Sequence, residues 1–146
     1  MNNPTTVQQV ARPNFVSTPL TKTYWNAAGN GDLLLQKCNT CDHLQHYPRS
    51  ICTRCWSTDL AWQAASGFGH VWTFTVVGIP GHAAWQKDVP FVLALVELEE
   101  GPRLMTNIVA CDPDSVRCGQ RVKLRPYRGE DDNQTLLQFV PATNDQ

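Results

Sequence analysis

The stretch Cys38-Asn39-Thr40-Cys41, followed by ten residues and then by Cys52-Thr53-Arg54-Cys55, decides the fold of this chain. Each C-x2-C pair can turn back so that both sulfurs face one ion, and two such pairs complete a tetrahedral site with Zn–S bonds of about 2.3 Å. Four protein ligands leave no open coordination position, so the spacing predicts one structural zinc ion held by Cys38, Cys41, Cys52 and Cys55. A pair of disulfides, or a lone redox C-x2-C, is the alternative.

Length and charge limit the rest of the interpretation. The chain has 146 residues and a formal net charge of −1, which suits one domain, or one small domain with an appendage. A ribbon of about twenty residues cannot bury its own core, and bound metal contributes an apparent ~10–16 kcal/mol to the folding of small zinc domains. No apolar run reaches the length of a membrane span, and the first residues lack the apolar core of a signal peptide, so we expect a cytoplasmic protein without a membrane partner.

The N-terminal part of the sequence predicts an arm and a short helix. Residues 1–17 are polar and interrupted by proline, which is typical of a mobile arm. Thr18 and Pro19 indicate the start of a helix and Gly29-Asn30-Gly31 its end, so we expect a helix over 19–28. We therefore divide the chain into an arm (1–17), an N-terminal helix (18–31), a zinc ribbon (32–59), a barrel (60–142) and a tail (143–146).

A short helix is marginal alone, so its aromatic pair must pack on something. Leu20 and Tyr24 share one face of the predicted helix, and Trp25 adjoins them. Packing within the chain and docking of a partner are both open, because an exposed aromatic stripe is also typical of an interface. We name Leu20, Tyr24 and Trp25 as the candidate partner interface.

After the ribbon the hydrophobic pattern changes to a period of two. It predicts six short strands, over 60–66, 70–77, 91–98, 104–110, 120–125 and 135–140. Gly67-Phe68-Gly69 indicates a hairpin or bulge, and Glu99-Glu100-Gly101-Pro102 a second hairpin. The strand over 91–96 does not alternate, so we expect it to be buried on both sides. The fold class predicted is mainly β: a short N-terminal helix, a rubredoxin-like zinc ribbon and a small barrel of the OB type.

Residues that could carry catalysis are few. We interpret Cys111 and Cys118 as buried structural cysteines. His43 and His46 lie in the ribbon loop, where the four matched cysteines leave them no role as ligands. The longest connection, over 78–90, contains His82 and is either functional or disordered. We expect no catalytic residue in this chain.

Basic and aromatic side chains offer candidate binding residues. Arg121, Lys123 and Arg125 share one face of a predicted strand, which is either a solvated face or a site for phosphate-bearing ligands. Trp72 and Phe74 should also share a face, where they would stack bases in a nucleic-acid-binding barrel or belong to the core.

Read together, these features resemble a known family, the acyl-CoA-associated zinc-ribbon OB-fold proteins, catalogued as domain of unknown function thirty-five. The resemblance covers Leu20 to about Val140. The resemblance rests on the four cysteines and on the sequence segments 24–28, 33–38, 46–49, 71–77, 89–91, 94–101, 106–109 and 119–122. Two knuckle positions depart from the family pattern: Asp42 stands where glycine is common, and Thr53 where proline is. Trp56 follows the fourth cysteine, at a place that favours a residue tolerant of positive φ, which tryptophan is not.

The resemblance implies a non-catalytic subunit that pairs with thiolase-like enzymes acting on acyl-CoA in lipid or steroid metabolism, including thiolases, acyltransferases and retro-aldol lyases. Some members of the family pair with hydratases instead. The resemblance also implies that the ribbon and the helix contribute to assembly and that the barrel lies near the CoA thioester. The groups suited to the CoA phosphates are Arg49, Arg121, Lys123 and Arg125. The alternative is a nucleic-acid-binding protein, which the slightly acidic charge disfavours.

Overall fold

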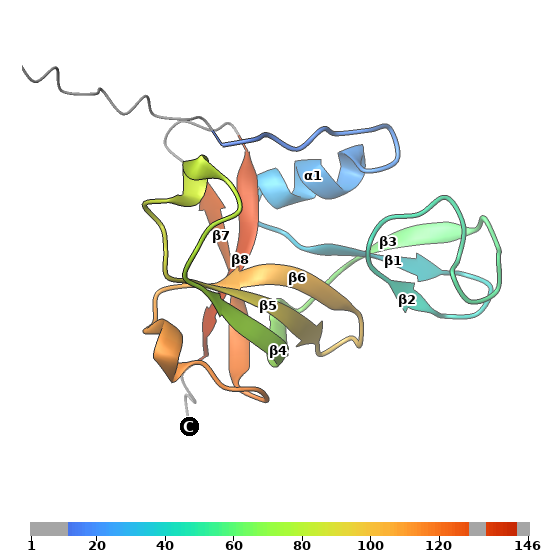
Figure 1. The fold of residues 1–146 in the computed structure, drawn as a ribbon. Helices are drawn as coiled ribbons and strands as arrows, with labels where there is room; N and C mark the ends of the chain where they lie inside the picture. Colours follow the sequence, from blue (N-terminus) through green and yellow to red (C-terminus); the bar gives the residue numbers. More distant parts are fainter. Residues whose placement is uncertain (1–11, 129–133, 143–146) are drawn as a thin grey trace, which may run out of the picture.

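The computed structural model describes residues 12–128 and 134–142, so the predicted tail and most of the predicted arm lie outside the described residues. A three-stranded ribbon sheet projects from a closed five-stranded barrel, and one helix lies beside the barrel (Figure 1). The elements are α1 (Lys22–Gly29), β1 (Leu34–Cys38), β2 (Leu44–Gln45), β3 (Leu60–Ala64), β4 (Phe68–Val77), η1 (Ala83–Trp85), β5 (Phe91–Leu98), β6 (Arg103–Ile108), η2 (Pro113–Ser115), β7 (Arg121–Arg128) and β8 (Thr135–Pro141). None of the described helices is long and apolar enough to cross a membrane.

Helix α1 begins three residues later than predicted. The carbonyl of Thr18 accepts hydrogen bonds from the N–H groups of Thr21 (3.0 Å) and Lys22 (2.9 Å), so residues 18–21 form a turn that precedes the helix. The predicted end is confirmed, because Gly31 takes a positive φ of 90° and its N–H donates to the carbonyl of Ala28. Glycine adopts this conformation without the Cβ clash that other residues meet.

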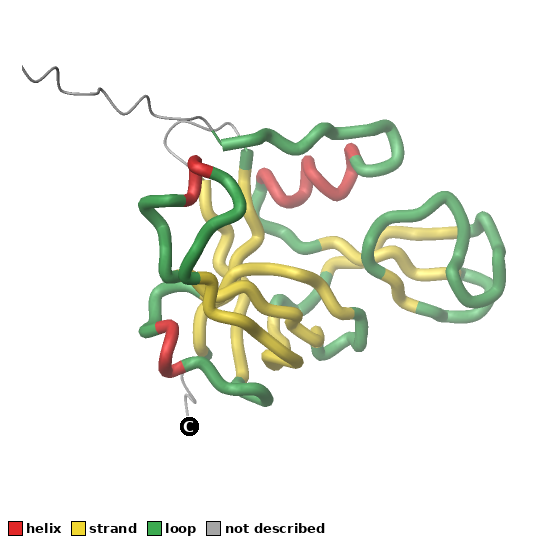
Figure 2. Tube along the Cα trace, in the orientation of Figure 1, coloured by secondary structure: helices red, strands yellow, loops and turns green. Residues whose placement is uncertain are grey.

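The ribbon sheet has β1 at its centre, with β2 and β3 antiparallel on either side. The prediction that residues 60–66 form a barrel strand was therefore wrong: Cys38 pairs with Leu60 and Leu34 with Ala64. Strand β3 follows the second knuckle and pairs with the edge of β1 that β2 leaves free. Period-two alternation identifies a strand, but it does not identify the neighbouring strand. Outside these three strands the ribbon consists of loops (Figure 2).

The barrel closes in the order β4-β5-β6-β8-β7, with β4 also paired to β7 and β6 parallel to β8. Its core contains Val71, Val92, Val96, Val122 and Phe139, all nearly inaccessible to solvent. This confirms the OB-type barrel, with five strands instead of six. Strand β5 alternates between buried and half-buried residues, so the expected burial on both sides was wrong. The second predicted hairpin is confirmed by the bond from the N–H of Leu98 to the carbonyl of Pro102, 2.9 Å.

A β-bulge in β4 separates the two aromatic residues that were expected to share a face. Val71 pairs with Val96 and Thr73 with Leu95, which leaves Trp72 as the extra residue. Trp72 is 51% exposed and is covered by the guanidinium of Arg103, 3.5 Å from the ring centroid. Phe74 instead packs against the core. The predicted aromatic pair is therefore absent from the outer face of β4.

An aromatic joint connects the N-terminal segment, the helix, the ribbon and the barrel. Successive ring centroids lie 3.6, 4.9, 5.4 and 4.0 Å apart along the series Phe15, Trp25, Tyr24, His46 and Tyr47. The hydroxyl of Tyr47 then accepts a 3.2 Å hydrogen bond from the N–H of Met105 on β6. Residues 12–17, predicted as part of a mobile arm, are thus packed through Phe15, whose N–H and carbonyl also bond the side chain of Gln134.

Gly69 lies where β4 pairs with both β5 and β7. A Cβ atom there would overlap the carbonyl oxygen of Glu97 and lie 2.9 Å from a methyl carbon of Val96. We expect Gly69→Ala to lower the free energy of unfolding by about 2 kcal/mol, because two strands must separate to admit the methyl group. Urea denaturation measures this. Gly81→Ala, whose Cβ would meet nothing within 4 Å, is the control, and equal effects of the two substitutions would contradict the steric argument.

Candidate metal centre

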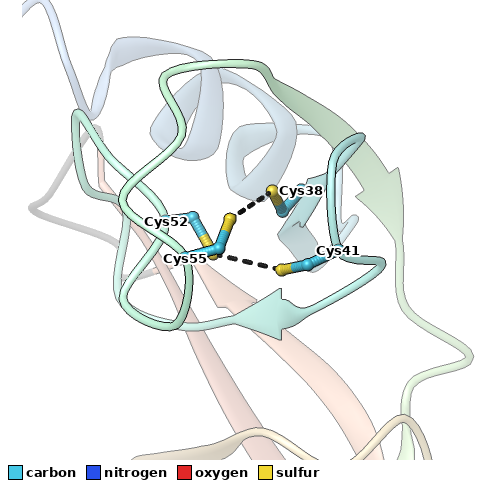
Figure 3. A group of neighbouring side chains, drawn as sticks. All are labelled: Cys38, Cys41, Cys52 and Cys55. Atoms are coloured by element: carbon cyan, nitrogen blue, oxygen red, sulfur yellow. Dashed lines mark hydrogen bonds between the residues drawn. The ribbon is translucent and has the colours of Figure 1, made fainter.

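The four ribbon cysteines converge at one point between the two knuckles (Figure 3). Their sulfur atoms all lie within 4.8 Å of one another, with Cys38 and Cys55 3.5 Å apart and Cys41 and Cys52 3.7 Å apart. Zn–S bonds of about 2.3 Å in a tetrahedron place sulfurs about 3.8 Å apart, whereas a disulfide bond measures about 2.05 Å. The geometry therefore fits one structural zinc ion, as the spacing predicted, and not a pair of disulfides.

The two knuckles use the same backbone hydrogen bonds. Asp42 donates its N–H to the carbonyl of Cys38 (2.9 Å), and Trp56 donates to that of Cys52 (3.0 Å). Both residues adopt the left-handed conformation, with φ of 57° for Asp42 and 68° for Trp56. This confirms the expectation that a positive φ is required after the second cysteine of each pair. The N–H of Arg54 also donates to the sulfur of Cys52, at 3.4 Å.

The four thiols of the cluster strongly shift one another's pKa values. Burial, the largest influence on Cys38, raises its pKa, but the N–H groups of Cys41 and Thr40 and the adjacent thiols lower it to about 6. At Cys41 the N–H of His43 lowers the pKa, but burial and the three other thiols outweigh this and raise it to about 12. Four thiols this close cannot all ionise without a cation. A divalent ion stabilises all four thiolates, and its binding therefore releases protons.

Two buried glutamines, which the sequence analysis did not select, hold the second knuckle in place. The side-chain amide of Gln36 donates to the carbonyl of Arg49 (3.0 Å) and accepts from its N–H (2.8 Å). Gln45 donates to Gln36 and to the carbonyl of Ile51, and accepts from the N–H of Thr53 at 2.9 Å. Polar residues at inward positions of otherwise apolar strands are the signal that could have identified them.

His46 occupies the centre of the aromatic joint. Both of its ring nitrogens are buried without a hydrogen-bond partner in the described part of the chain. Burial lowers its pKa from 6.5 to about 4, so the ring is neutral at physiological pH. Burial, followed by the influence of Tyr47, also raises the pKa of Tyr24 to about 12. The joint is therefore uncharged, and His46 takes no part in the cysteine cluster.

The remaining cysteines and histidines are separate from the metal centre. Cys111 is half-buried, and burial raises its pKa. Cys118 is exposed, so the prediction that it is buried was wrong. His43 contacts the hydroxyl of Thr53 at 3.2 Å and is not one of the four clustered ligands. His82 caps the short helix η1 by accepting from the N–H of Ala84.

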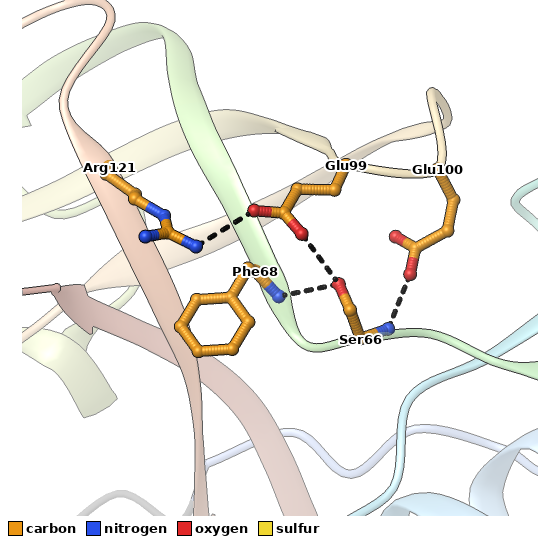
Figure 4. A network of polar contacts seen from close by, with 5 residues as sticks. All are labelled: Ser66, Phe68, Glu99, Glu100 and Arg121. Atoms are coloured by element: carbon orange, nitrogen blue, oxygen red, sulfur yellow. Dashed lines mark hydrogen bonds and ion pairs between the residues drawn. The ribbon is translucent and has the colours of Figure 1, made fainter.

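The four basic residues proposed for CoA do not form one group. Arg121, Lys123 and Arg125 lie on the exposed face of β7, as predicted, whereas Arg49 lies on the ribbon. The guanidinium of Arg121 is 3.1 Å from Glu99 and 4.8 Å from the ring centroid of Phe68, and Glu99 also contacts Ser66 (Figure 4). Lys123 and Arg125 have no acidic partner among residues 12–128 and 134–142. Of the three basic residues on this face of β7, Lys123 and Arg125 are therefore the ones free to contact an anionic ligand.

The candidate partner interface, on α1 and the turn before it, is largely covered by the chain itself. Tyr24 is 7% exposed and belongs to the core, and Trp25 is stacked on Phe15. Leu20 remains 42% exposed. Burial favours packing within the chain for the two aromatic residues, and the role of the three residues in binding a partner stays a prediction.

The described fold agrees with two protein-family models. Residues 25–61 match the family described as "ChsH2, rubredoxin-like zinc ribbon domain", and residues 62–125 match "ChsH2, C-terminal OB-fold domain". The first match includes the four cysteines, Trp25 of α1, and Tyr47 and Trp56 of the ribbon. The second covers β4 to the middle of β7.

Three similar proteins are named as subunits or scaffolds. A probable enoyl-CoA hydratase alpha subunit of Thermomonospora curvata is 39% identical over 119 residues, which are 82% of this chain and 36% of that protein. A DUF35 domain-containing scaffold protein of Methanothermobacter thermautotrophicus is 32% identical over 133 residues, 86% of this chain and 98% of that protein. Benzoylsuccinyl-CoA thiolase subunit BbsA of Geobacter metallireducens is 28% identical over 107 residues, 70% of this chain and 68% of that protein.

A solved structure shares the whole arrangement. The structure titled "Ltp2-ChsH2(DUF35) aldolase" contains a chain that superposes with a TM-score of 0.79 and 36% sequence identity, covering 90% of this chain and all of that one. A similar arrangement of ribbon, helix and barrel therefore occurs in a structure whose title also names a second protein, Ltp2.

Proposed function

Because this chain belongs to the DUF35 family of zinc-ribbon and OB-fold proteins, we propose that it is a non-catalytic accessory subunit. It binds a thiolase-like enzyme and helps that enzyme to bind its acyl-CoA substrate. The enzyme partner supplies the catalytic residues, and the chain supplies a scaffold. The enoyl-CoA and benzoylsuccinyl-CoA in the names of two relatives favour a partner that acts on an acyl-CoA substrate.

The observation that carries this proposal is the agreement with a chain of the Ltp2–ChsH2 aldolase structure, which covers 90% of this chain at 36% sequence identity. The metal site supports it, since a closed four-thiolate centre has no position for substrate or water. The names of the relatives, which include a scaffold protein, a hydratase subunit and a thiolase subunit, point in the same direction.

Strand β7 is the surface that we propose for CoA. Lys123 and Arg125 are exposed, lie two residues apart on one face and lack acidic partners in the described chain. CoA carries phosphates, which ammonium and guanidinium groups bind through charge-assisted hydrogen bonds. Arg121 is less available because it already pairs with Glu99. Within the proposed complex, this face would bind the phosphates while the partner holds the acyl group.

The test is to purify the tagged chain from its source organism, identify the co-purifying enzyme by mass spectrometry and reconstitute the pair from recombinant subunits. We expect a stable complex by size-exclusion chromatography, no turnover of acyl-CoA thioesters by the isolated chain, and tighter CoA binding by the pair than by the enzyme alone. Calorimetric titration with CoA measures the last of these.

Two outcomes would overturn the proposal. Appreciable turnover of acyl-CoA thioesters by the isolated, metal-loaded chain would make it an enzyme in its own right. A tight affinity for single-stranded oligonucleotide that falls steeply with salt would favour the nucleic-acid alternative, since counterion release gives such binding its salt dependence.

A further inference from the structure

A groove opens on the ribbon beside the second knuckle. It has a volume of about 400 Å³ and is lined by Arg49, Ser50, Ile51, Cys52, Thr53 and Trp56. We call it the Arg49–Trp56 groove. Its walls are mostly apolar, and Arg49 carries the one positive charge among the lining residues. The metal centre uses only the sulfur of Cys52, so the groove lies outside the site described above.

The backbone below the groove is held rigidly, while its two largest side chains are free. Gln36 bonds both the N–H and the carbonyl of Arg49, and Gln45 bonds the carbonyl of Ile51 and the N–H of Thr53. Arg49 is exposed and has no acidic partner in residues 12–128 and 134–142. A fixed backbone reduces the entropy lost on binding, which favours affinity.

Trp56 is the unusual residue of the groove. Its side chain is 77% exposed, so it contributes little to the core. Its backbone has a φ of 68°, a conformation that glycine or asparagine adopts at lower cost. A bulky residue kept in a strained conformation where it is not buried points to a role in binding. Tryptophan and arginine are also the side chains most enriched at the energetic centres of protein interfaces.

The charge of the site selects the kind of occupant. Four thiolates and one Zn²⁺ have a formal charge of −2, which disfavours a ligand with several phosphates next to Cys52. A single carboxylate beside apolar side chains suits both Arg49 and the indole of Trp56. We infer that the Arg49–Trp56 groove binds a segment of the partner enzyme in which an Asp or Glu adjoins an aliphatic or aromatic side chain. This inference rests on the proposed function.

Three variants of the full, zinc-loaded chain test this inference. Their affinities are measured for the recombinant partner enzyme that the co-purification experiment identifies. Arg49→Glu places like charges together and should weaken the complex by about thirtyfold or more, which is the scale of an interface hot spot. Trp56→Gly should weaken it about tenfold, yet the thermal midpoint of the isolated chain should not fall, because glycine relieves the strained φ. Arg54→Glu, an exposed arginine of the same knuckle outside the groove, is the matched control.

A binding role for Trp56 would be supported if Trp56→Gly bound the partner more weakly while its thermal midpoint did not fall and its zinc content stayed normal. If Trp56 were purely structural, the substitution would lower stability and affinity together. If the partner bound all three variants as it binds the wild-type chain, the groove would not be the contact, although the accessory function would stand. If Arg49→Glu weakened CoA binding by the isolated chain and left the affinity for the enzyme unchanged, the groove would be a phosphate site, and the inference would be overturned. Failure of the wild-type chain to form any complex would reject the proposed function itself.

Discussion

Replacing Cys52 with serine is expected to release the zinc ion and unfold the ribbon. Cys52 is 0% exposed, and its sulfur lies 3.7 Å from that of Cys41, so a hydroxyl in its place leaves three thiolates and an incomplete tetrahedron. Zinc supplies most of the folding free energy of small domains that lack a core. Metal analysis should find about one zinc ion per wild-type chain and almost none in Cys52→Ser.

Hydrogen exchange should show which strands unfold when Cys52→Ser loses its zinc ion. Amides of β1 and β2 should lose their protection in Cys52→Ser. Those of β5 should keep it, because β5 is paired with β4 and β6 in the closed barrel and buries Val92 and Val96 there. Partner binding should be lost as well. The control is Cys118→Ser, an exposed cysteine outside the cluster, which should retain zinc. A variant at Cys52 that kept both its metal and a protected β1 would show that the ribbon does not depend on the ion.

The second large effect is a loss of folding stability at low pH that is caused by His46. Its pKa is 6.5 in the unfolded chain and about 4 in the folded chain, because burial disfavours the charged ring. Between these values the unfolded chain binds the proton and the folded chain does not. Stability is therefore fully present above pH 6.5 and falls as the pH drops toward 4, by roughly 3 kcal/mol in total.

The comparison that isolates this effect uses His46→Phe, which keeps the ring and all four cysteines. Urea unfolding at pH 7 and at pH 5 should show the wild-type chain losing about 2 kcal/mol more than the variant. At pH 7 the variant should be as stable as the wild type or more so, since it removes two buried nitrogens that lack partners. Metal release at low pH affects both proteins alike. Parallel pH profiles would contradict a buried neutral histidine.

Local patterns were enough to predict the metal site and the kinds of element. Two C-x2-C pairs specify a tetrahedral thiolate site because each pair spans one tight turn, and the requirement for positive φ at Asp42 and Trp56 follows from that turn. The hairpin at 99–102 was predicted from its own glycine and proline. In each case the deciding interactions join residues close together in the chain.

The sequence by itself thus determined the zinc centre, the ribbon and the β domain of the OB type, since cysteine spacing and period-two alternation are local signals. Only the tertiary structure decided that β3 pairs with β1, that the bulge at Trp72 turns Phe74 inward, and that Tyr24 and His46 pack together in one joint. It also separated Arg49 on the ribbon from Lys123 and Arg125 on β7. These features depend on which distant segments meet, and that is settled by the packing of the whole chain.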